Sequence, residues 1–230
     1  MTRQIVLDTE TTGLDPRDGH RIIEIGCVEM INRRVTDNYW HHYLNPEREI
    51  DAGAFEVHGI SNEFVADKPR FAELATDFLG YVRGAELVIH NAAFDVGFLN
   101  HELSMLDGDR PRIEEICSVT DSLQMARQKH PGQKNNLDAL CKRYSIDNSN
   151  RRLHGALLDS EILAEVYLAM TGGQTLLILD EERSEQGNES IVARVEVQHD
   201  LPLFEVDATD SAAHQDYLEF LRKTSGQSLW

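Results

Sequence analysis

The feature that most constrains this chain is an apolar run near the N-terminus that ends in two acidic residues. The run Ile5-Val6-Leu7 is followed by Asp8-Thr9-Glu10-Thr11-Thr12-Gly13. Short apolar, β-branched runs that break at a glycine predict a buried strand, and side chains two residues apart share one face of a strand. Asp8 and Glu10 therefore project together, about 6 to 7 Å apart. Like charges this close repel each other unless a cation lies between them, which suggests a divalent metal; the alternative is an ordinary strand end with solvated acids.

Two further acidic residues occur in similar settings. The apolar run at residues 87–89 leads through His90 and Asn91 into a helical stretch with Asp95 in its first turn. Another helical stretch begins after His154 and carries Asp159 in its first turn. Alone, Asp95 would be explained as an acid that favours a helix N-terminus. Together, four carboxylates and one histidine are the set that two Mg²⁺ or Mn²⁺ ions and a general base require.

These three motifs resemble those of the DEDD 3'→5' exonucleases of the histidine subtype. The resemblance rests on Asp8–Gly13, on His90-Asn91-Ala92-Ala93-Phe94-Asp95 and on His154-Gly155-Ala156-Leu157-Leu158-Asp159, which follow the family's order and spacing over about residues 4–170. Within that family the match is closest to the proofreading subunits of bacterial replicative polymerases. The resemblance implies a ribonuclease-H-like α/β fold, with a mixed five-stranded sheet flanked by helices. The pattern of elements alone predicts only some mixed sheet.

The resemblance also implies roles for the site residues. Asp8 would bridge two metal ions, with Glu10, Asp95 and Asp159 completing their ligands, and Glu10 would also contact the terminal 3' hydroxyl. His154 would be the general base, since an imidazole is neutral near pH 7 and can accept a proton from the attacking water. Weaker substrate contacts are expected from residues that could equally serve packing or turns: Thr11, Thr12, Leu14, His58, Asn91, Phe94 and the loop Asn135-Asn136-Leu137.

Charge and length limit how such a chain could hold a nucleic acid. The 230 residues suffice for one domain with a sizeable core plus an appendage. A net charge of -18 argues against wrapping a long duplex. Residues 110–154 reverse the sign, with nine Lys or Arg against five acids. We therefore expect a few nucleotides to be held by metals and a small basic rim, although solvated helix faces would explain the same bases.

Targeting and redox signals are absent from the sequence. We see no leader-like N-terminus and no apolar run long enough to span a bilayer, so we expect a cytoplasmic protein without membrane contact. Cys27, Cys117 and Cys141 form no C-x-x-C pair and are expected to be reduced, buried thiols.

Hydrophobic periodicity divides the chain into elements and two regions. Residues 1–172 are expected to form the exonuclease domain, and residues 173–230 a linker and an extended docking tail. After Asn45-Pro46 the pattern is irregular up to Phe71. Strands are expected at 4–8, 21–32, 33–44, 87–90 and 116–120, with a turn at Asn32-Arg33, and helices at 71–79, 93–106, 121–129, 137–144 and 156–170.

The tail contains three candidate docking segments. Gln174, Leu177 and Leu179 fit a sliding-clamp-binding peptide, and their place directly after the domain favours them. Residues 212–222 predict an amphipathic helix, too short to be stable alone, that would dock on the polymerase catalytic subunit. The apolar stripe of that helix comprises Tyr217, Leu218 and Leu221, and a rival clamp peptide has Gln198, Leu201, Leu203 and Phe204.

Taken together, the sequence predicts a two-metal-dependent 3'→5' exonuclease that acts on a single-stranded or frayed DNA 3' end, releases nucleoside monophosphates and proofreads for a bacterial replicative polymerase. Its partners would be the polymerase catalytic subunit and the sliding clamp, with a small stabilising third subunit left open. One alternative is a ribonuclease that trims RNA 3' ends, against which the docking tail argues. Another is a non-catalytic scaffold, against which the complete set of five catalytic residues argues.

Overall fold

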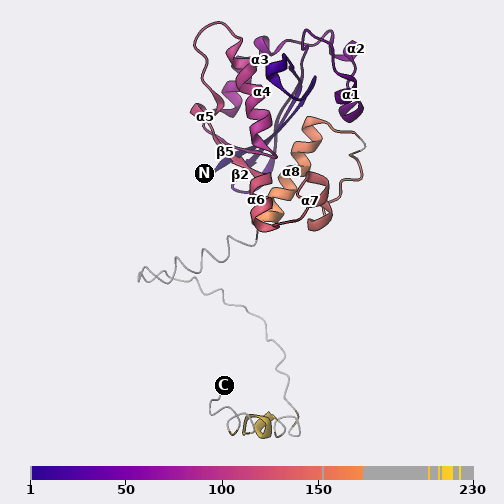
Figure 1. The fold of residues 1–230 in the computed structure, drawn as a ribbon. Coiled ribbons are helices and arrows are strands. Elements are labelled where there is room, and N and C mark those ends of the chain that lie inside the picture. Colours follow the sequence, from indigo (N-terminus) through magenta and orange to yellow (C-terminus); the bar gives the residue numbers. More distant parts are fainter. Residues whose placement is uncertain are drawn as a thin grey trace, which may run out of the picture. The chain divides into compact units, whose positions relative to one another are not determined.

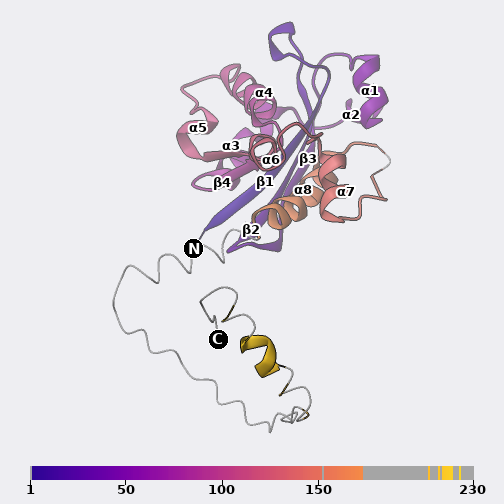
Figure 2. The same ribbon diagram turned by 60° about the horizontal axis from the view of Figure 1, so that its bottom comes forward.

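The computed structural model describes residues 2–151, 153–172, 207, 212, 214–219 and 223. Its main body is a mixed five-stranded sheet, which confirms the expected fold class. Figures 1 and 2 show helices on both faces of the sheet. The strand order is β3-β2-β1-β4-β5. The first three strands are antiparallel, and β4 and β5 run parallel to β1. The strands are β1 (Arg3–Thr11), β2 (Ile22–Ile31), β3 (Arg34–Tyr43), β4 (Glu86–Ile89) and β5 (Ser118–Asp121).

Alternating side chains on the central strand build two separate cores. Ile5 and Leu7 pack with apolar residues of α3 and α4 on one face of the sheet. Val6 packs with residues of α6, α7 and α8 on the other face. Figure 2 shows the strands between these two groups of helices. The helices are α1 (Ala52–His58), α2 (Asn62–Val65), α3 (Phe71–Val82), α4 (Ala92–Ser104), α5 (Ile113–Ile116), α6 (Ser122–Lys129), α7 (Leu137–Tyr144) and α8 (Ala156–Thr171), with the 3-10 turn η1 (Pro16–Asp18).

The hairpin between β2 and β3 turns at the predicted residues. Asn32 and Arg33 have φ angles of 50° and 64°, the left-handed conformation that a two-residue hairpin turn requires at both positions. Arg33 also donates hydrogen bonds to Thr171 Oγ1 (2.7 Å) and to the carbonyl of Leu168 (3.0 Å). These carbonyl and hydroxyl groups lie at the C-terminal end of α8, so the turn fastens that helix to the sheet.

The sequence pattern predicts an irregular stretch after Pro46. This prediction is wrong, because the stretch contains the short helices α1 and α2. Helices of seven and four residues are too short to show a helical period in the sequence, which explains the error. Gly59 ends α1 with φ 70°, and its N–H bonds to the carbonyl of Phe55. The carbonyl of Val57 in α1 accepts the N–H of His154 (3.1 Å). A helix that was not predicted thus holds the loop before α8.

A glycine allows α8 to begin directly against the sheet. A Cβ atom at Gly26 in β2 would lie 2.3 Å from backbone atoms of Ala156 and Leu157, which no packing tolerates. Ser160 Oγ donates to the Gly26 carbonyl (3.0 Å) and fixes the register of the helix on the strand. The first turn of α8, which carries Asp159, is therefore placed by backbone-to-backbone contact.

A buried ion pair positions α4 on the opposite face. Glu102, 1% exposed, receives two hydrogen bonds of 2.8 Å from the guanidinium of Arg21 and one from the backbone N–H of Ile22. A bidentate pair of this kind adds direction as well as energy. The helix that carries Asp95 is consequently anchored to the start of β2.

The described part of the tail is helical at residues 212, 214–219 and 223, in agreement with the amphipathic helix expected there. Tyr217 is 58% exposed, and Leu218 is less exposed. Leu221 and both candidate clamp peptides lie outside the described residues. Among described residues no helix has the length and apolarity that crossing a membrane requires. Cys27, Cys117 and Cys141 are buried free thiols.

Candidate active site

The site lies where β1 continues beyond the end of its pairing with the parallel strand β4. Pairing of β1 with β4 ends at Val6 and Val88, whereas pairing with β2 continues to Thr11. Asp8 and Glu10 therefore lie on a segment that has a strand partner on one side only. Clefts at the C-terminal ends of parallel strands are common ligand sites in such sheets.

Two helices bring further side chains to this edge from opposite faces. Directly after β4, Asn91 adopts the left-handed conformation (φ 71°) and turns the chain into α4, so that Asp95 falls in the first turn of that helix. From the other face, α8 supplies Asp159, also in its first turn. His154 comes from the loop that precedes α8.

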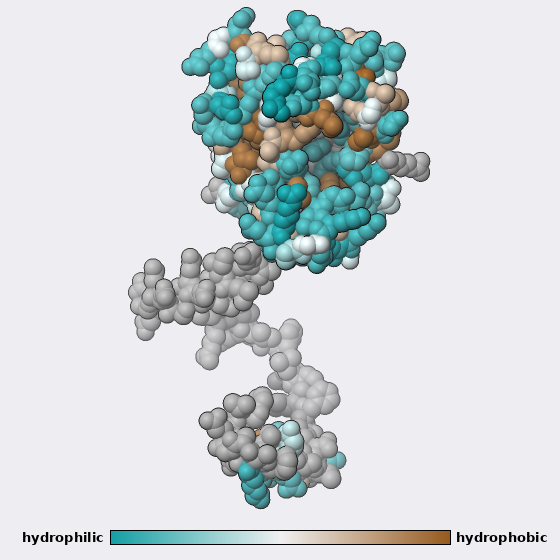
Figure 3. Space-filling view, viewed as in Figure 1, coloured by the Kyte–Doolittle hydropathy of each residue, from teal (hydrophilic) through white to brown (hydrophobic). Residues whose placement is uncertain are grey.

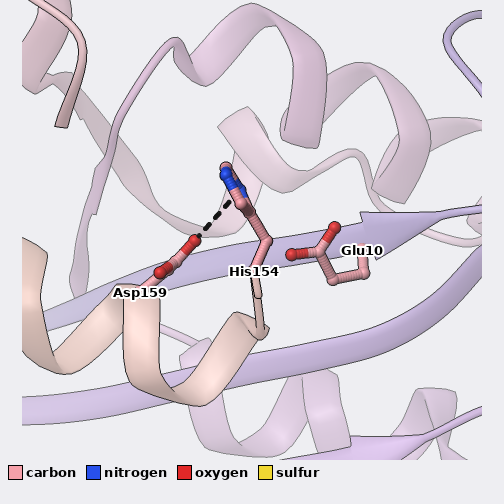
Figure 4. Close-up of side chains that lie close together, drawn as sticks. All are labelled: Glu10, His154 and Asp159. Atoms are coloured by element: carbon pink, nitrogen blue, oxygen red, sulfur yellow. Dashed lines mark ion pairs between the residues drawn. The ribbon is translucent and has the colours of Figure 1, made fainter. Parts of the chain in front are cut away.

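The five predicted catalytic residues line one cavity of about 360 Å³. Ligating atoms of Glu10, His154 and Asp159 all lie within 4.8 Å of one another. His154 Nδ1 is 3.5 Å from Asp159 Oδ2, and Figure 4 shows the carboxylate of Glu10 on its strand facing this pair. The cavity thereby brings together acids from three distant motifs.

Burial raises the pKa values of three of the acids, Asp8, Glu10 and Asp95. Burial, followed by repulsion from Asp95 and Glu10, raises the pKa of Asp8 well above its usual value. Burial and the nearby charge of Asp159 raise the pKa of Glu10 to about 8. Burial raises the pKa of Asp95 to about 7, although Thr9 Oγ1 donates a hydrogen bond to it (2.7 Å). Hard oxygen ligands crowded in this way fit Mg²⁺ or Mn²⁺, whose charge would remove the repulsion.

Arg151 is the site residue that sequence reasoning missed. Its guanidinium bonds to both oxygens of Asp159, with Nη2 at 2.7 Å from Oδ2, and Nη2 also lies 3.1 Å from His154 Nδ1. Nη1 donates to Asp138 Oδ1 (2.8 Å). The sequence placed Arg151 only among the bases before His154; its spacing of three residues from that histidine was the available signal. His90, Asn136 and Leu137 also line the cavity.

The environment of His154 keeps its imidazole neutral. Burial and the positive charge of Arg151 lower the pKa of His154, while Asp159 opposes them. Because the guanidinium can only donate, Nδ1 of His154 accepts this hydrogen bond with its lone pair, and the neutral ring carries its proton on Nε2. A neutral imidazole has the protonation state that a general base needs.

A second cavity, of about 410 Å³, adjoins the first and shares Thr9, Glu10 and Phe94 with it. Thr11, His58 and Leu14 line it, and Leu14 is 86% exposed. His58 Nδ1 accepts the N–H of Ile60 (2.9 Å), and burial lowers the pKa of His58, so its neutral ring carries a proton on Nε2. The cavity therefore combines apolar walls with a hydrogen-bond donor.

Two of the weaker predicted substrate contacts, Asn91 and Thr12, do not line this second cavity. Asn91 lines the catalytic cavity and a third cavity of about 400 Å³, whose lining includes His90, Arg127 and Asn136. Thr12 reaches neither of the first two cavities, because it is 0% exposed. Its hydroxyl bonds to His20 Nδ1 and accepts the N–H of Arg21 (both 3.0 Å), so Thr12 holds the loop rather than facing a ligand.

Figure 3 shows apolar residues gathered near the middle of one face within a mostly hydrophilic surface.

A mixed sheet of this order with an acid-lined cavity at its edge defines an exonuclease of the ribonuclease-H-like class. In agreement, the family model described as "Exonuclease" (RNase_T) matches residues 5–167. The solved structure "Exonuclease X in complex with 5' overhanging duplex DNA" is 28% identical with a TM-score of 0.58, covering 75% of this chain and 93% of that one. The nuclease domain of 3'hExo, described as a DEDDh family member bound to rAMP, is 18% identical with a TM-score of 0.64, covers 75% and 92%, and supports the fold alone.

Sequence relatives narrow the class to one family. DNA polymerase III subunit epsilon of Escherichia coli (strain K12) is 55% identical over 100% of this chain and 98% of its own length. The protein of that name from Haemophilus influenzae is 53% identical over 99% and 94%. The chain belongs to the DNA polymerase III epsilon-subunit family, and it is a 3'→5' exonuclease.

Proposed function

We propose that this exonuclease removes mispaired nucleotides from the 3' end of DNA as the proofreading subunit of a bacterial replicative polymerase, working in the cytoplasm. The observation that carries the proposal is the meeting of four carboxylates and His154 in one cavity, in a chain 55% identical to a DNA polymerase III subunit epsilon along its whole length. The product would be a nucleoside monophosphate.

The four acids and His154 each have a defined part in the proposed hydrolysis. Asp8, Glu10, Asp95 and Asp159 would hold two divalent ions. When bound, such ions activate water and stabilise the charge on the departing 3' oxygen. His154 accepts the proton of the attacking water at a ring nitrogen.

The second cavity suits the terminal nucleoside. Its walls include the apolar side chains of Leu14, Val57 and Phe94, which can pack against a base. His58 Nε2–H can donate to a polar group of the nucleoside. Glu10 borders both cavities, so its carboxylate can accept a hydrogen bond from the 3' hydroxyl while it faces the metal site.

The first test compares 3' ends of matched duplexes. We expect a primer with a terminal mispair to lose its last nucleotide about tenfold faster than the fully paired primer, because each terminal pair costs roughly 1 to 2 kcal/mol to open. Release of mononucleotides in Mg²⁺ is followed by electrophoresis. The control is the same primer with its mispair moved ten positions inward, which should behave as the paired primer does. Equal rates on all three would refute proofreading selectivity, and faster cleavage of an RNA 3' end would favour the RNA-trimming alternative.

We also propose that residues 1–172 are the catalytic domain and residues 173–230 a docking tail. Support comes from the helix described at residues 214–219, with its exposed Tyr217, and from the end of α8 at Thr171. Docking would hold the nuclease at a high effective concentration near the primer end. The sliding clamp and a small third subunit remain proposed partners, the latter on the catalytic domain.

The second test separates docking from catalysis. Deletion of residues 173–230 should keep nuclease activity within about twofold, because every residue of the catalytic cavity remains, but should abolish co-purification with the polymerase subunit. Substituting alanine at Leu177 and Leu179 should abolish clamp binding, whereas alanine at Leu201, Leu203 and Phe204 should not. A polymerase complex that survives the deletion would contradict the docking proposal, and the opposite pattern for the two peptides would assign clamp binding to the second.

A further inference from the structure

Arg151 lines the catalytic cavity and pairs with one of its acids, Asp159. Its Nε and Nη2 form a fork that engages both oxygens of Asp159, and its side chain is 8% exposed. The carboxylate of Asp159 is itself 4% exposed. Buried bidentate pairs of this kind are strong and directional. In this state the two oxygens of Asp159 are therefore committed to a cation that belongs to the chain.

This arrangement competes with a bound metal ion. The guanidinium uses one lone pair of each oxygen of Asp159, and a divalent cation on the same carboxylate would be repelled by the positive charge of Arg151. The cluster nevertheless needs positive charge whenever metal is absent. Burial is the largest cause of the raised pKa values of Asp8 and Glu10, and Arg151 is the group that opposes the rise for both.

A second contact keeps Arg151 close to the cavity if it leaves Asp159. Nη1 donates to Asp138 Oδ1 (2.8 Å), in the first turn of α7. Asp138 also lines the cavity, and its side chain is half exposed. A guanidinium held there through Nη1 would retain Nε and Nη2 as free donors, which is the geometry that binds phosphate oxygens.

We propose that Arg151 is an exchangeable counter-ion: it pairs with Asp159 in the metal-free protein, yields Asp159 to a divalent cation, and then binds a phosphate of the substrate strand while Asp138 holds it at the rim. The proposal deepens the proposed function and rests on its metal site. Arg151 then alternates between two partners, Asp159 and a substrate phosphate, so that phosphate binding is complete only after the metal is bound.

The test titrates Mn²⁺ alone, by calorimetry, into the metal-free full chain without DNA. We expect Arg151→Ala to bind Mn²⁺ about tenfold more tightly than the natural chain, because no hydrogen-bonded pair has to be broken. Its metal-free Tm at pH 8 should fall, because the carboxylates lose their counter-ion. Arg151→Lys keeps the charge but not the fork, and should bind Mn²⁺ with an intermediate affinity.

The matched control is Arg143→Ala. Arg143 lies in α7, and among the described residues it bonds only to neutral groups, namely the side chains of Asn135 and Gln133 and the carbonyl of Lys134. Its removal subtracts the same charge without touching the acids, so Mn²⁺ affinity should change by less than about twofold. If Arg143→Ala bound Mn²⁺ more tightly by the same factor, the change in Mn²⁺ affinity would be due to long-range charge alone, and this result would overturn the exchange.

The phosphate half of the proposal is read from steady-state kinetics at saturating Mn²⁺. Arg151→Ala and Asp138→Asn should raise KM for an oligonucleotide about tenfold while kcat changes less, since both lose a phosphate contact or its anchor. Unchanged KM in both would overturn the phosphate role. Weaker or unchanged Mn²⁺ binding by Arg151→Ala and Arg151→Lys would overturn the exchange, whereas a natural chain that binds no Mn²⁺ would refute the metal site of the proposed function itself.

Discussion

Asp8→Asn is expected to lower the cleavage rate by about a thousandfold or more, because the metal ions it would help to hold supply several kcal/mol of transition-state stabilisation. Asparagine has nearly the same shape as aspartate and keeps one oxygen, so the loss would come from charge and not from packing. The rate is measured as release of the terminal nucleotide from a single-stranded oligonucleotide in saturating Mg²⁺.

The same substitution should stabilise the protein when metal is absent. Asp8 faces Asp95, Glu10 and Asp159, and burial with their repulsion raises its pKa. Removing one of the four charges relieves that repulsion, so the metal-free Tm at pH 8 should rise, while the increase in Tm that Mg²⁺ gives the natural chain should largely disappear. Opposite changes in activity and stability are typical of residues kept for function.

Glu29→Gln provides a matched control. Glu29 is a buried acid on β2, but it is paired with Arg3 at 2.6 Å. Burial tends to raise the pKa of Glu29, yet hydrogen bonds from Arg3 and Thr36 outweigh it and lower the pKa. This control should therefore lose stability and keep its activity. Normal activity of Asp8→Asn would show that Asp8 is not a catalytic residue.

The catalytic acids were predictable from sequence to different degrees. Asp8 and Glu10 follow from the period of a strand alone, and their shared cavity agrees with it. Asp95 and Asp159 approach from opposite faces of the sheet, and no periodicity within one element can specify such a meeting. That part of the prediction came from the resemblance of three motifs, and only the relative placement of α4 and α8 on the sheet explains it physically.

The parts that could not be predicted depend on loops and long side chains. Arg151 reaches Asp159 because the segment before α8 is held to α1 through the His154 N–H, and α1 was itself too short to recognise. Thr12 is separated by a single residue from Glu10, but the chain turns there and buries its hydroxyl against His20. Local sequence does not determine which side of such a turn faces a cavity.

The stability of the metal-free protein should fall as pH rises, relative to a variant without the Glu10 carboxyl. Burial and Asp159 raise the pKa of Glu10 from 4.5 to about 8 in the folded protein. A group with a raised folded pKa contributes its stability below its unfolded pKa and loses it as pH rises through the folded value. Glu10→Gln lacks this titration, so the Tm difference between the variant and the natural chain should widen from pH 5.5 to 8.5.

The expected size of this widening is about 3 kcal/mol, or about 6 to 12 °C in Tm for a domain of this size. Burial also lowers the pKa values of His42, His58 and His90, so their titration changes stability with pH. These histidines are present in both chains, so their contribution cancels from the Tm difference at each pH. Tm is measured by thermal unfolding in EDTA and again in excess Mg²⁺.

Magnesium should reverse the trend, because binding requires ionised carboxylates and therefore strengthens as pH rises. The natural chain would then gain more Tm from Mg²⁺ at pH 8.5 than at pH 5.5, whereas Glu10→Gln would gain little at either. A Tm difference in EDTA that stays constant across this range would mean that Glu10 is ionised throughout and that the acids do not repel one another. The crowding that makes this cavity a metal site would then be absent, even with all five side chains in place.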